Sequence, residues 1–331
     1  MPLARGHAGW DEYWASSRLG SCVPENPEIA RTIAAFWLGR FLDQPPGTRI
    51  LDVATGNGIV LAYAAEAARR GSRRYALTGV DLAAIDPARH AAAGAPLLRE
   101  ITFLGGVPAE QLPFADGSFD RVCSQYGLEY ADLPRALAEA ARVLAPGGRL
   151  LWMAHHLLSD VVTESAGQRR ELDYLLGSGS VYAAMRGFVE AHARRRDPER
   201  AAMRLQAALR EAQDWCRANP PARIVAGTCS EFVEIARRPG DFRAEDLVRM
   251  LDDGERRLRM HRLRIDDLAG AVLTPPRLEV ARAALSGPGW SDLRVQEIRV
   301  GPRQSCIGVL VEASRVASPR ATDAGTGPGT P

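Results

Sequence analysis

The chain has 331 residues, and its 42 basic side chains are all arginine, because the sequence contains no lysine. The absence of lysine excludes Schiff-base aldolases, pyridoxal-phosphate enzymes, P-loop NTPases and protein kinases, each of which needs a lysine amine at a defined place. The formal net charge of +2 lacks the strongly basic balance of a dedicated nucleic-acid-binding protein. Composition thus removes several chemistries without indicating one.

Apolar runs and cysteines set further limits. The unbroken apolar runs are much shorter than the roughly 20 residues that a helix needs to cross a bilayer, so we expect no membrane span. The N-terminal residues show no apolar core followed by a small-residue cleavage site, which predicts a cytoplasmic protein. The five cysteines are scattered and form no C-x-x-C pair. We therefore expect neither a disulfide framework nor a metal site.

The predicted elements begin with an N-terminal helical extension over residues 1–45. Within it, Trp10, Tyr13 and Trp14 have the spacing i, i+3, i+4 and share one helical face. Strand and helix patterns then alternate over residues 46–156, which predicts parallel strands in an open sheet covered on both faces. The predicted strands span residues 49–54, 75–81, 101–104, 120–124 and 149–154, and the predicted helices span residues 59–70 and 133–144.

The second half of the chain begins with a change of character. Residues 157–270 are rich in arginine and glutamate with helical spacing of apolar residues, which predicts a helical insertion. The alternation resumes over residues 271–313, with a helix at 277–285 and strands at 293–300 and 305–312 that complete the same sheet. Residues 314–331 are small and polar without apolar periodicity, so we predict a disordered tail.

A glycine-rich turn follows the first predicted strand, in the sequence ILDVATGNG at residues 50–58. Glycines at such a turn allow backbone amides and a helix N-terminus to approach a ligand closely. Asp52 at the strand end suits a ligand that carries an ammonium or sulfonium group. Asp81, at the end of the second strand, stands where a carboxylate accepts hydrogen bonds from a ribose diol. Ile59 replaces the third glycine of a dinucleotide-binding turn, which disfavours a nicotinamide-dependent oxidoreductase.

With these residues the sequence resembles the class I, Rossmann-like S-adenosylmethionine-dependent methyltransferases, particularly the small-molecule branch that includes the quinone-biosynthesis C-methyltransferases. The resemblance covers about residues 48–156 and returns at 277–313, and it includes LPFADGSFD at 112–120 and RVLAPGGRL at 142–150. It implies an α/β fold with a Rossmann-like, mostly parallel seven-stranded sheet, helices on both faces and a helical lid inserted after the fifth strand.

The resemblance also implies a cofactor site for S-adenosyl-L-methionine. The glycine-rich turn would contact its methionine part, Asp81 its ribose, and the segment before Leu112 its adenine. Pro108 stands where family members often have Asp or Asn to accept from the adenine amino group, so that contact must come from a neighbour or be absent. The cofactor-binding residues that we predict are Asp52, Ala54, Gly56, Asn57, Gly58, Asp81, Leu82, Ala109, Glu110, Ser124, Gln125 and Tyr13.

The predicted catalytic residues are Tyr126, His155 and His156, which follow the fourth and fifth strands. Ligands of open α/β sheets bind beyond the carboxyl ends of the strands, so these side chains are expected near the substrate. A neutral histidine there can take a proton from a hydroxyl or amine nucleophile, and packing within the lid is the alternative for either histidine. The insertion 157–270 is by hypothesis the substrate lid, which excludes water from the methyl group.

The sequence therefore predicts an enzyme that transfers the methyl group of S-adenosylmethionine to an O, N or C atom of a small molecule, with S-adenosylhomocysteine as product. Three alternatives stay open: another S-adenosylmethionine-dependent reaction, such as cyclisation or aminocarboxypropyl transfer, a catalytically silent binding subunit, and a nicotinamide-dependent oxidoreductase, which Asp52 and the missing third glycine disfavour. The expected partner is a small-molecule substrate, with neither nucleic acid nor membrane, and a homodimer is left open.

Overall fold

The computed structural model describes residues 7–15, 19–20, 27–90, 95–302 and 304–317, and the described chain forms two compact units. The first unit comprises Trp14–His156 and the chain from Leu273 onward. The second comprises Leu157–Val272 together with the N-terminal stretch up to Tyr13. The predicted tail lies outside the described residues from residue 318 onward.

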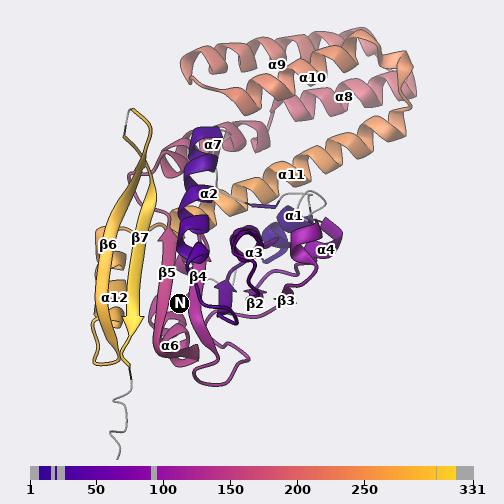
Figure 1. The fold of residues 1–331 in the computed structure, drawn as a ribbon. Helices are drawn as coiled ribbons and strands as arrows, with labels where there is room; N and C mark the ends of the chain where they lie inside the picture. The colour runs from indigo at the N-terminus through magenta and orange to yellow at the C-terminus, as the bar shows by residue number, and fades with distance from the viewer. Residues whose placement is uncertain (1–6, 16–18, 21–26, 91–94, 303, 318–331) are drawn as a thin grey trace, which may run out of the picture. The chain divides into compact units, whose positions relative to one another are not determined.

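The first unit contains a seven-stranded sheet (Figure 1). Its strands are β1 (Arg49–Val53), β2 (Ala76–Asp81), β3 (Thr102–Gly105), β4 (Phe119–Gln125), β5 (Leu144–Ala154), β6 (Trp290–Val300) and β7 (Ser305–Arg315). The spatial order is β3-β2-β1-β4-β5-β7-β6. The first five strands are parallel to their neighbours, and β7 is antiparallel to both β5 and β6. The predicted Rossmann-like, mostly parallel α/β sheet is confirmed.

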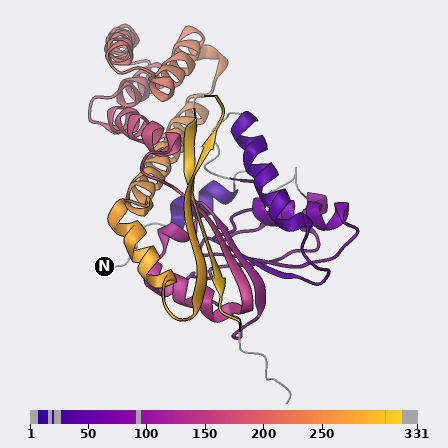
Figure 2. The same cartoon turned by 60° about the vertical axis from the view of Figure 1, so that its left-hand side comes forward.

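Helices cover both faces of this sheet because successive residues of a strand point to opposite faces. The helices α2 (Pro27–Leu42) and α3 (Ile59–Arg70) pack with Ile50, Cys123 and Leu151 in one buried cluster. The helices α6 (Leu133–Val143) and α12 (Pro275–Leu285) pack with the alternate residues Leu51 and Val122 in the other. Figure 2 shows α2 (indigo) and α12 (orange) on opposite sides of the sheet. Shorter elements complete the unit: α4 (Pro87–His90), α5 (Ala95–Leu98) and the 3₁₀ turn η2 (Leu128–Tyr130).

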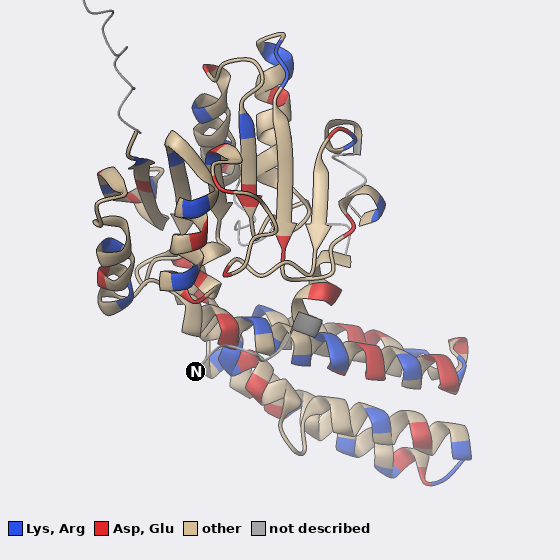
Figure 3. Ribbon diagram, turned by 90° about the horizontal axis from the view of Figure 1, so that it is seen from below, with Lys and Arg blue, Asp and Glu red and all other residues tan. Residues whose placement is uncertain are grey.

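The second unit is helical and has its own apolar core. Its elements are α1 (His7–Ala15), whose last two residues fall in the first unit, α7 (Asp160–Leu176), α8 (Val181–Arg194), α9 (Pro198–Ala218), α10 (Arg223–Arg237), the 3₁₀ turn η3 (Pro239–Asp241) and α11 (Ala244–Ala271). The core includes Met185, Phe232 and Leu251, all almost fully buried. Acidic and basic residues are interspersed along the long helices (Figure 3). No helix among the described residues has the length and apolar character needed to span a membrane.

Two predicted boundaries are corrected near the fourth and fifth strands. The helix expected at 133–144 ends at Val143, and β5 begins at Leu144 rather than at residue 149. Leu144 pairs with Phe119, and the register is irregular between this pair and the next one, Arg121 with Arg149. The Ala-Pro-Gly-Gly segment is therefore an irregular beginning of the strand. A third boundary is corrected at the last strand, because β7 continues to Arg315, past residue 313, where the core was expected to end.

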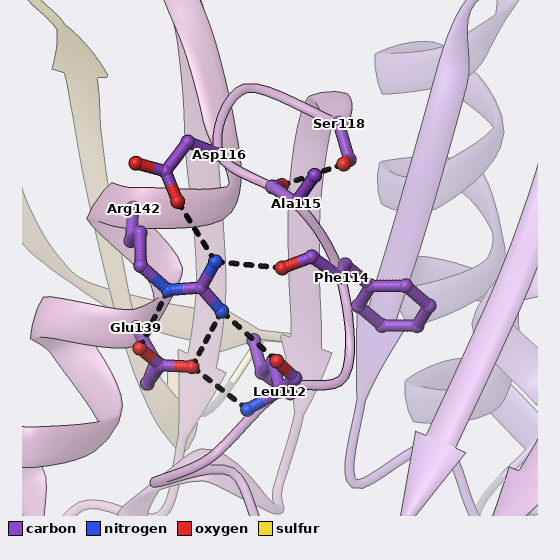
Figure 4. Close-up of polar contacts among 7 residues, drawn as sticks. All are labelled: Leu112, Phe114, Ala115, Asp116, Ser118, Glu139 and Arg142. Carbon is purple, nitrogen blue, oxygen red and sulfur yellow. Dashed lines mark hydrogen bonds and ion pairs between the residues drawn. The ribbon is translucent and has the colours of Figure 1, made fainter.

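Arg142 of α6 holds the segment 112–118 that leads into β4 (Figure 4). Its guanidinium donates to the carbonyl oxygens of Phe114 (2.6 Å) and Leu112 (2.9 Å) and to Asp116 Oδ1 (3.0 Å). It also donates to Glu139 Oε1 at 2.7 Å, while Glu139 Oε2 accepts from the backbone N–H of Leu112 at 2.7 Å. The Arg142 guanidinium holds the pKa of the Glu139 carboxyl below its usual range. The two sequence motifs at 112–120 and 142–150 are thus joined by direct hydrogen bonds.

We expect Arg142→Ala to destabilise the protein by about 1–3 kcal/mol, because it leaves two partly buried carbonyl groups and the Glu139 carboxylate without their donor. Urea unfolding followed by circular dichroism measures this change. Asp116→Ala is the matched control, because its carboxylate is 83% exposed and an exposed ion pair adds about 0–1 kcal/mol. Equal losses of unfolding free energy in the two variants would contradict the role of Arg142 in holding residues 112–118.

Candidate active site

The glycine-rich turn between β1 and α3 is held by the acid at the end of β2. The backbone N–H of Gly56 donates to Asp81 Oδ2 at 2.8 Å, and that of Ala83 donates to Asp81 Oδ1 at 2.8 Å. Gly56 and Gly58 have φ of +53° and +86°, values that favour glycine. Each oxygen of a carboxylate has capacity for a second hydrogen bond. Asp81 therefore fixes the turn and places its carboxylate beside it.

Asp52 is buried beneath the same turn, with 1% of its surface exposed. Thr55 Oγ1 donates to Asp52 Oδ2 at 2.6 Å, and no donor among the described residues reaches Oδ1. Burial raises the pKa of the Asp52 carboxyl to about 8; the Thr55 hydrogen bond opposes this shift and the nearby charge of Asp81 adds to it. A buried carboxylate with an open acceptor atom suits a ligand that carries a positive charge or an N–H donor.

The aromatic residues of α1 have different surroundings, although their spacing predicted one shared face. Trp14 lies on the turn: a Cβ at Gly56 would overlap its ring, and Asn57 Nδ2 donates to the Trp14 carbonyl at 2.9 Å. Tyr13, which was the aromatic residue predicted to bind the cofactor, lies under the Arg264 guanidinium at 4.8 Å from its ring centroid. Trp10 Nε1 donates to Asp267 at 3.1 Å. Trp14, which belongs to the first unit, therefore lies at the glycine-rich turn, whereas Trp10 and Tyr13 contact residues of the second unit.

The remaining predicted cofactor residues divide into two groups. The first group lies near Asp81. Leu82 follows it and is exposed, and the segment that contains Ala109 and Glu110 begins where the N–H of Val107 donates to the Asp81 carbonyl at 2.9 Å. Glu110 Oε1 accepts from the backbone N–H of Asp132 at 2.8 Å. This segment therefore runs from the Asp81 edge of the sheet to the start of α6.

Ser124 and Gln125 of β4 have partners within the protein interior. Ser124 Oγ accepts from the N–H of Leu128 at 3.0 Å, and Gln125 Oε1 accepts from Trp37 Nε1 at 2.6 Å. The turn after β4 touches the turn after β1 through Ala54, because a Cβ at Gly127 would overlap the Ala54 methyl group. Ala54 itself has a φ of +56°. The two turns therefore pack together, while the Gln125 side chain is directed to α2.

The predicted catalytic residues lie at the carboxyl ends of β4 and β5. Tyr126 has a φ of +55°, and its hydroxyl donates to the carbonyl of Ile307 in β7 at 2.8 Å. Its ring centroid lies 4.6 Å from that of His155. The His155 side chain is fully buried, and its Nδ1 lies 2.7 Å from Glu129 Oε1. Tyr126 and His155 are thus brought together, with the Tyr126 hydroxyl committed to β7.

His156 points to the other face, as alternation along a strand requires. Its Nδ1 lies 3.9 Å from Cys306 Sγ, and its backbone forms a bridge with Leu273, where the chain re-enters the first unit. The two adjacent histidines therefore do not converge on one point. Consistent with this, the described residues contain no cluster of His, Cys, Asp or Glu arranged to hold a metal ion.

Glu129 is a site residue that sequence reasoning missed. Its carboxylate is fully buried, and it contacts His155 and Trp152 of β5. The sequence offered one signal for it. Glu129 is an acidic residue three positions after Tyr126, shortly after a predicted buried strand, in a segment that otherwise packs into the core. Glu129 was missed because its partner His155 lies far away in the sequence, whereas Trp14 was considered as part of the aromatic face that it shares with Trp10 and Tyr13.

Comparisons with known proteins agree with this geometry. A methyltransferase domain family model matches residues 51–152. The chain is 41% identical over 106 residues to the ubiquinone/menaquinone biosynthesis C-methyltransferase UbiE of Geobacter sulfurreducens, which covers 31% of this chain and 40% of that protein. It is 40% identical over 108 residues to the demethylmenaquinone methyltransferase of Renibacterium salmoninarum, covering 32% of this chain and 40% of that protein. The solved YcgJ protein from Bacillus subtilis is 28% identical, covers 41% of this chain and 58% of its own, and has a TM-score of 0.34.

The chain spans about 40% of the length of these two curated relatives. The family match includes the glycine-rich turn and Asp81, which holds it. Residues 51–152 therefore match a methyltransferase domain within a Rossmann-like sheet, and the chain is similar to the quinone-biosynthesis C-methyltransferases.

Proposed function

We propose that the whole chain is an enzyme that transfers the methyl group of S-adenosylmethionine to an O, N or C atom of a small molecule and leaves S-adenosylhomocysteine. The observation that carries the proposal is the pair of buried acids at the glycine-rich turn, Asp52 with an open acceptor atom and Asp81 with its carboxylate fixed by two backbone N–H groups. When bound, the cofactor supplies an electrophilic methyl group on a sulfonium, which a nucleophilic substrate atom attacks directly.

The cofactor would be held by groups that the turn gathers. Asp81 would accept from the ribose hydroxyls, and Asp52 would face a positively charged or N–H-bearing part of the ligand. The Trp14 indole, which lies on Gly56, would cover the turn and exclude water. The segment that contains Ala109 would lie against the adenine, beside Pro108, which offers no side-chain acceptor.

On the substrate side, His155 is the proposed proton acceptor. It is enclosed by Tyr126 and Glu129 at the carboxyl edge of the sheet, where ligands of this architecture bind. Tyr126 would shape the site through its ring, because its hydroxyl is bonded to β7. The helical unit begins after His156 and ends before Leu273, which supports the hypothesis that it is a substrate lid.

A quinone-type substrate is the first candidate for the methylated molecule. One curated relative is a ubiquinone/menaquinone biosynthesis C-methyltransferase, and the other is a demethylmenaquinone methyltransferase. The similarity to each covers about a third of this chain. The substrate proposal therefore depends on a direct test.

We expect purified protein that is incubated with S-adenosylmethionine and chemically reduced demethylmenaquinone, or with a panel of small phenols and amines, to produce S-adenosylhomocysteine. Mass spectrometry of the spent cofactor distinguishes methyl transfer from aminocarboxypropyl transfer, which leaves methylthioadenosine, and from cyclisation, which leaves the cofactor unchanged. Asp81→Ala serves as the control, because it should abolish turnover together with cofactor binding. Unchanged cofactor affinity in that variant would favour a different binding site.

Proton release should accompany cofactor binding. Because the pKa of Asp52 is raised to about 8, its carboxyl group is largely protonated at pH 7 in the free protein. A positive charge placed beside it favours the ionised form, so binding should release up to one proton and affinity should rise as pH increases from about 6 to about 8. Calorimetry in buffers of different ionisation enthalpy measures this release. In Asp52→Asn the release should vanish, and a release that persists would assign it to another group.

Trp14 should contribute to cofactor affinity more than Tyr13. Removal of the indole uncovers the turn and deletes a face that can attract a sulfonium, an interaction of about 1–2 kcal/mol, so Trp14→Ala should raise the Kd for S-adenosylmethionine about tenfold. Calorimetric titration gives the Kd, and Trp14→Phe should recover most of the affinity. Tyr13→Ala is the matched control. A larger effect of Tyr13→Ala would restore the interpretation made from the sequence.

A further inference from the structure

Two arginines lie side by side on adjacent parallel strands of the sheet. Arg121 of β4 and Arg149 of β5 are partners in the sheet register. Cys123 and Leu151, two residues further along each strand, belong to the buried cluster that α2 and α3 cover, and residues two apart on a strand share a face. Both arginine side chains therefore project from the α2 side of the sheet. Like charges directly opposite each other destabilise a sheet, so this pair requires a compensating charge.

The described chain supplies no carboxylate to either arginine. Arg121 Nη1 donates to the backbone carbonyl of Asp120 at 2.7 Å, and the Arg149 guanidinium has no hydrogen-bond or ion-pair partner among the residues that the structure describes. The Asp120 carboxylate is bound by Arg49, whose Nη2 lies 2.7 Å from Oδ1. Asp120 precedes Arg121 in β4, so its side chain points to the opposite face of the sheet. The carboxylate closest in sequence therefore serves a different arginine on the other face.

Glu312 of β7 lies on the same face as the pair but is bound by another arginine. It is the register partner of Leu151 and so shares the face of that residue. Its Oε1 lies 2.8 Å from Nη1 of Arg40 in α2. Arg294 of β6, directly opposite Glu312, has no ion-pair partner in the described part of the chain. Arg294 thus adds a further positive charge to this side of the sheet.

The environments of the two arginines differ. Arg121 is half-buried, and burial lowers the pKa of its guanidinium; the charge of Arg149 lowers this pKa further, whereas Cys123 and Asp120 raise it. Arg149 is exposed, so a ligand can reach the pair directly from solvent. An anion between the two guanidinium groups would offset their repulsion and accept charge-assisted hydrogen bonds from both.

We propose that Arg121 and Arg149 form a binding site for a dianionic phosphate group, separate from the cofactor site. Adjacent strands are about 4.8 Å apart, so guanidinium groups on two of them can contact different oxygens of one tetrahedral anion. The planar fork of arginine donors matches phosphate geometry. Arg121 is the third residue of β4, whereas the glycine-rich turn follows the carboxyl end of β1. The ligand is inorganic phosphate or a small phosphorylated molecule, and the site is independent of the proposed methyl transfer.

Thermal unfolding of the full chain tests for this site without substrate or cofactor. A ligand that binds the native protein raises its Tm, so we expect millimolar phosphate or pyrophosphate to raise Tm by about 2 °C or more relative to sodium chloride at equal ionic strength. A larger rise with pyrophosphate or glycerol 3-phosphate than with phosphate assigns the site to a phosphorylated molecule, and the reverse order assigns it to the free ion. Equal Tm values in all of these salts would overturn the proposal.

Arg149→Gln is the most informative variant, because it removes one of two like charges and breaks no side-chain hydrogen bond within the described chain. Without added anion, its Tm should equal or exceed that of the unmodified protein. Its Kd for pyrophosphate, measured by calorimetry, should rise at least about tenfold, as expected for the loss of a hydrogen bond to a charged group. Arg121→Gln should have a similar effect on this Kd. Arg31→Gln, at an exposed arginine of α2, is the matched control and should leave it unchanged.

The variants separate a specific site from a general response to charge. An unchanged pyrophosphate Kd in folded Arg149→Gln would contradict the proposal, and so would an equal rise of Kd in Arg149→Gln and Arg31→Gln, which indicates an effect of net charge alone. The Kd for S-adenosylmethionine should be the same in Arg149→Gln as in the unmodified protein. Competition between pyrophosphate and the cofactor would place the anion at the glycine-rich turn and overturn the assignment to Arg121 and Arg149.

Discussion

Buried carboxylates at the carboxyl edge of the sheet impose the constraint on which the site depends. Asp52, Asp81 and Glu129 follow or end three neighbouring parallel strands, so all three lie at the same edge. A carboxylate out of water must be protonated, hydrogen-bonded or paired. The structure uses a different solution for each. Burial raises the pKa of Asp52 to about 8, two backbone N–H groups donate to Asp81, and the Trp152 indole and the His155 backbone N–H donate to Glu129.

These three solutions have different chemical consequences. Asp52 is the acid that can still change its charge, because its second oxygen lacks a donor among the described residues. Asp81 is fixed by the turn that it holds, so its geometry is set before any ligand arrives. Glu129 accepts from the Trp152 indole and from the His155 backbone N–H, so its carboxylate joins the turn after β4 to the end of β5. One edge of the sheet therefore offers a responsive acid, a rigid acceptor and an oriented imidazole.

The sequence predicted those parts of this arrangement that depend on local pattern. Period-two alternation and glycine-rich turns identified the strands, and Asp52 and Asp81 could be placed because each occupies a strand end in a short motif. Contacts between residues far apart in the sequence could not be predicted from local pattern. The clamp of Arg142 on Leu112 and Phe114, the position of Trp14 on Gly56, and the contact of Glu129 with His155 all arise from packing of elements far apart in the chain.

The two histidines show how a local rule can both help and mislead. Their adjacency after a strand marked them as candidates together, yet alternation sends His155 to Glu129 and His156 to Cys306. The missing lysine also has a structural counterpart. Every basic side chain except histidine is arginine, and the donor to the Glu129 carbonyl oxygen is accordingly a guanidinium, that of Arg277. A guanidinium presents its N–H donors in one rigid plane, so it can hold the turn after β4 in a fixed orientation against α12.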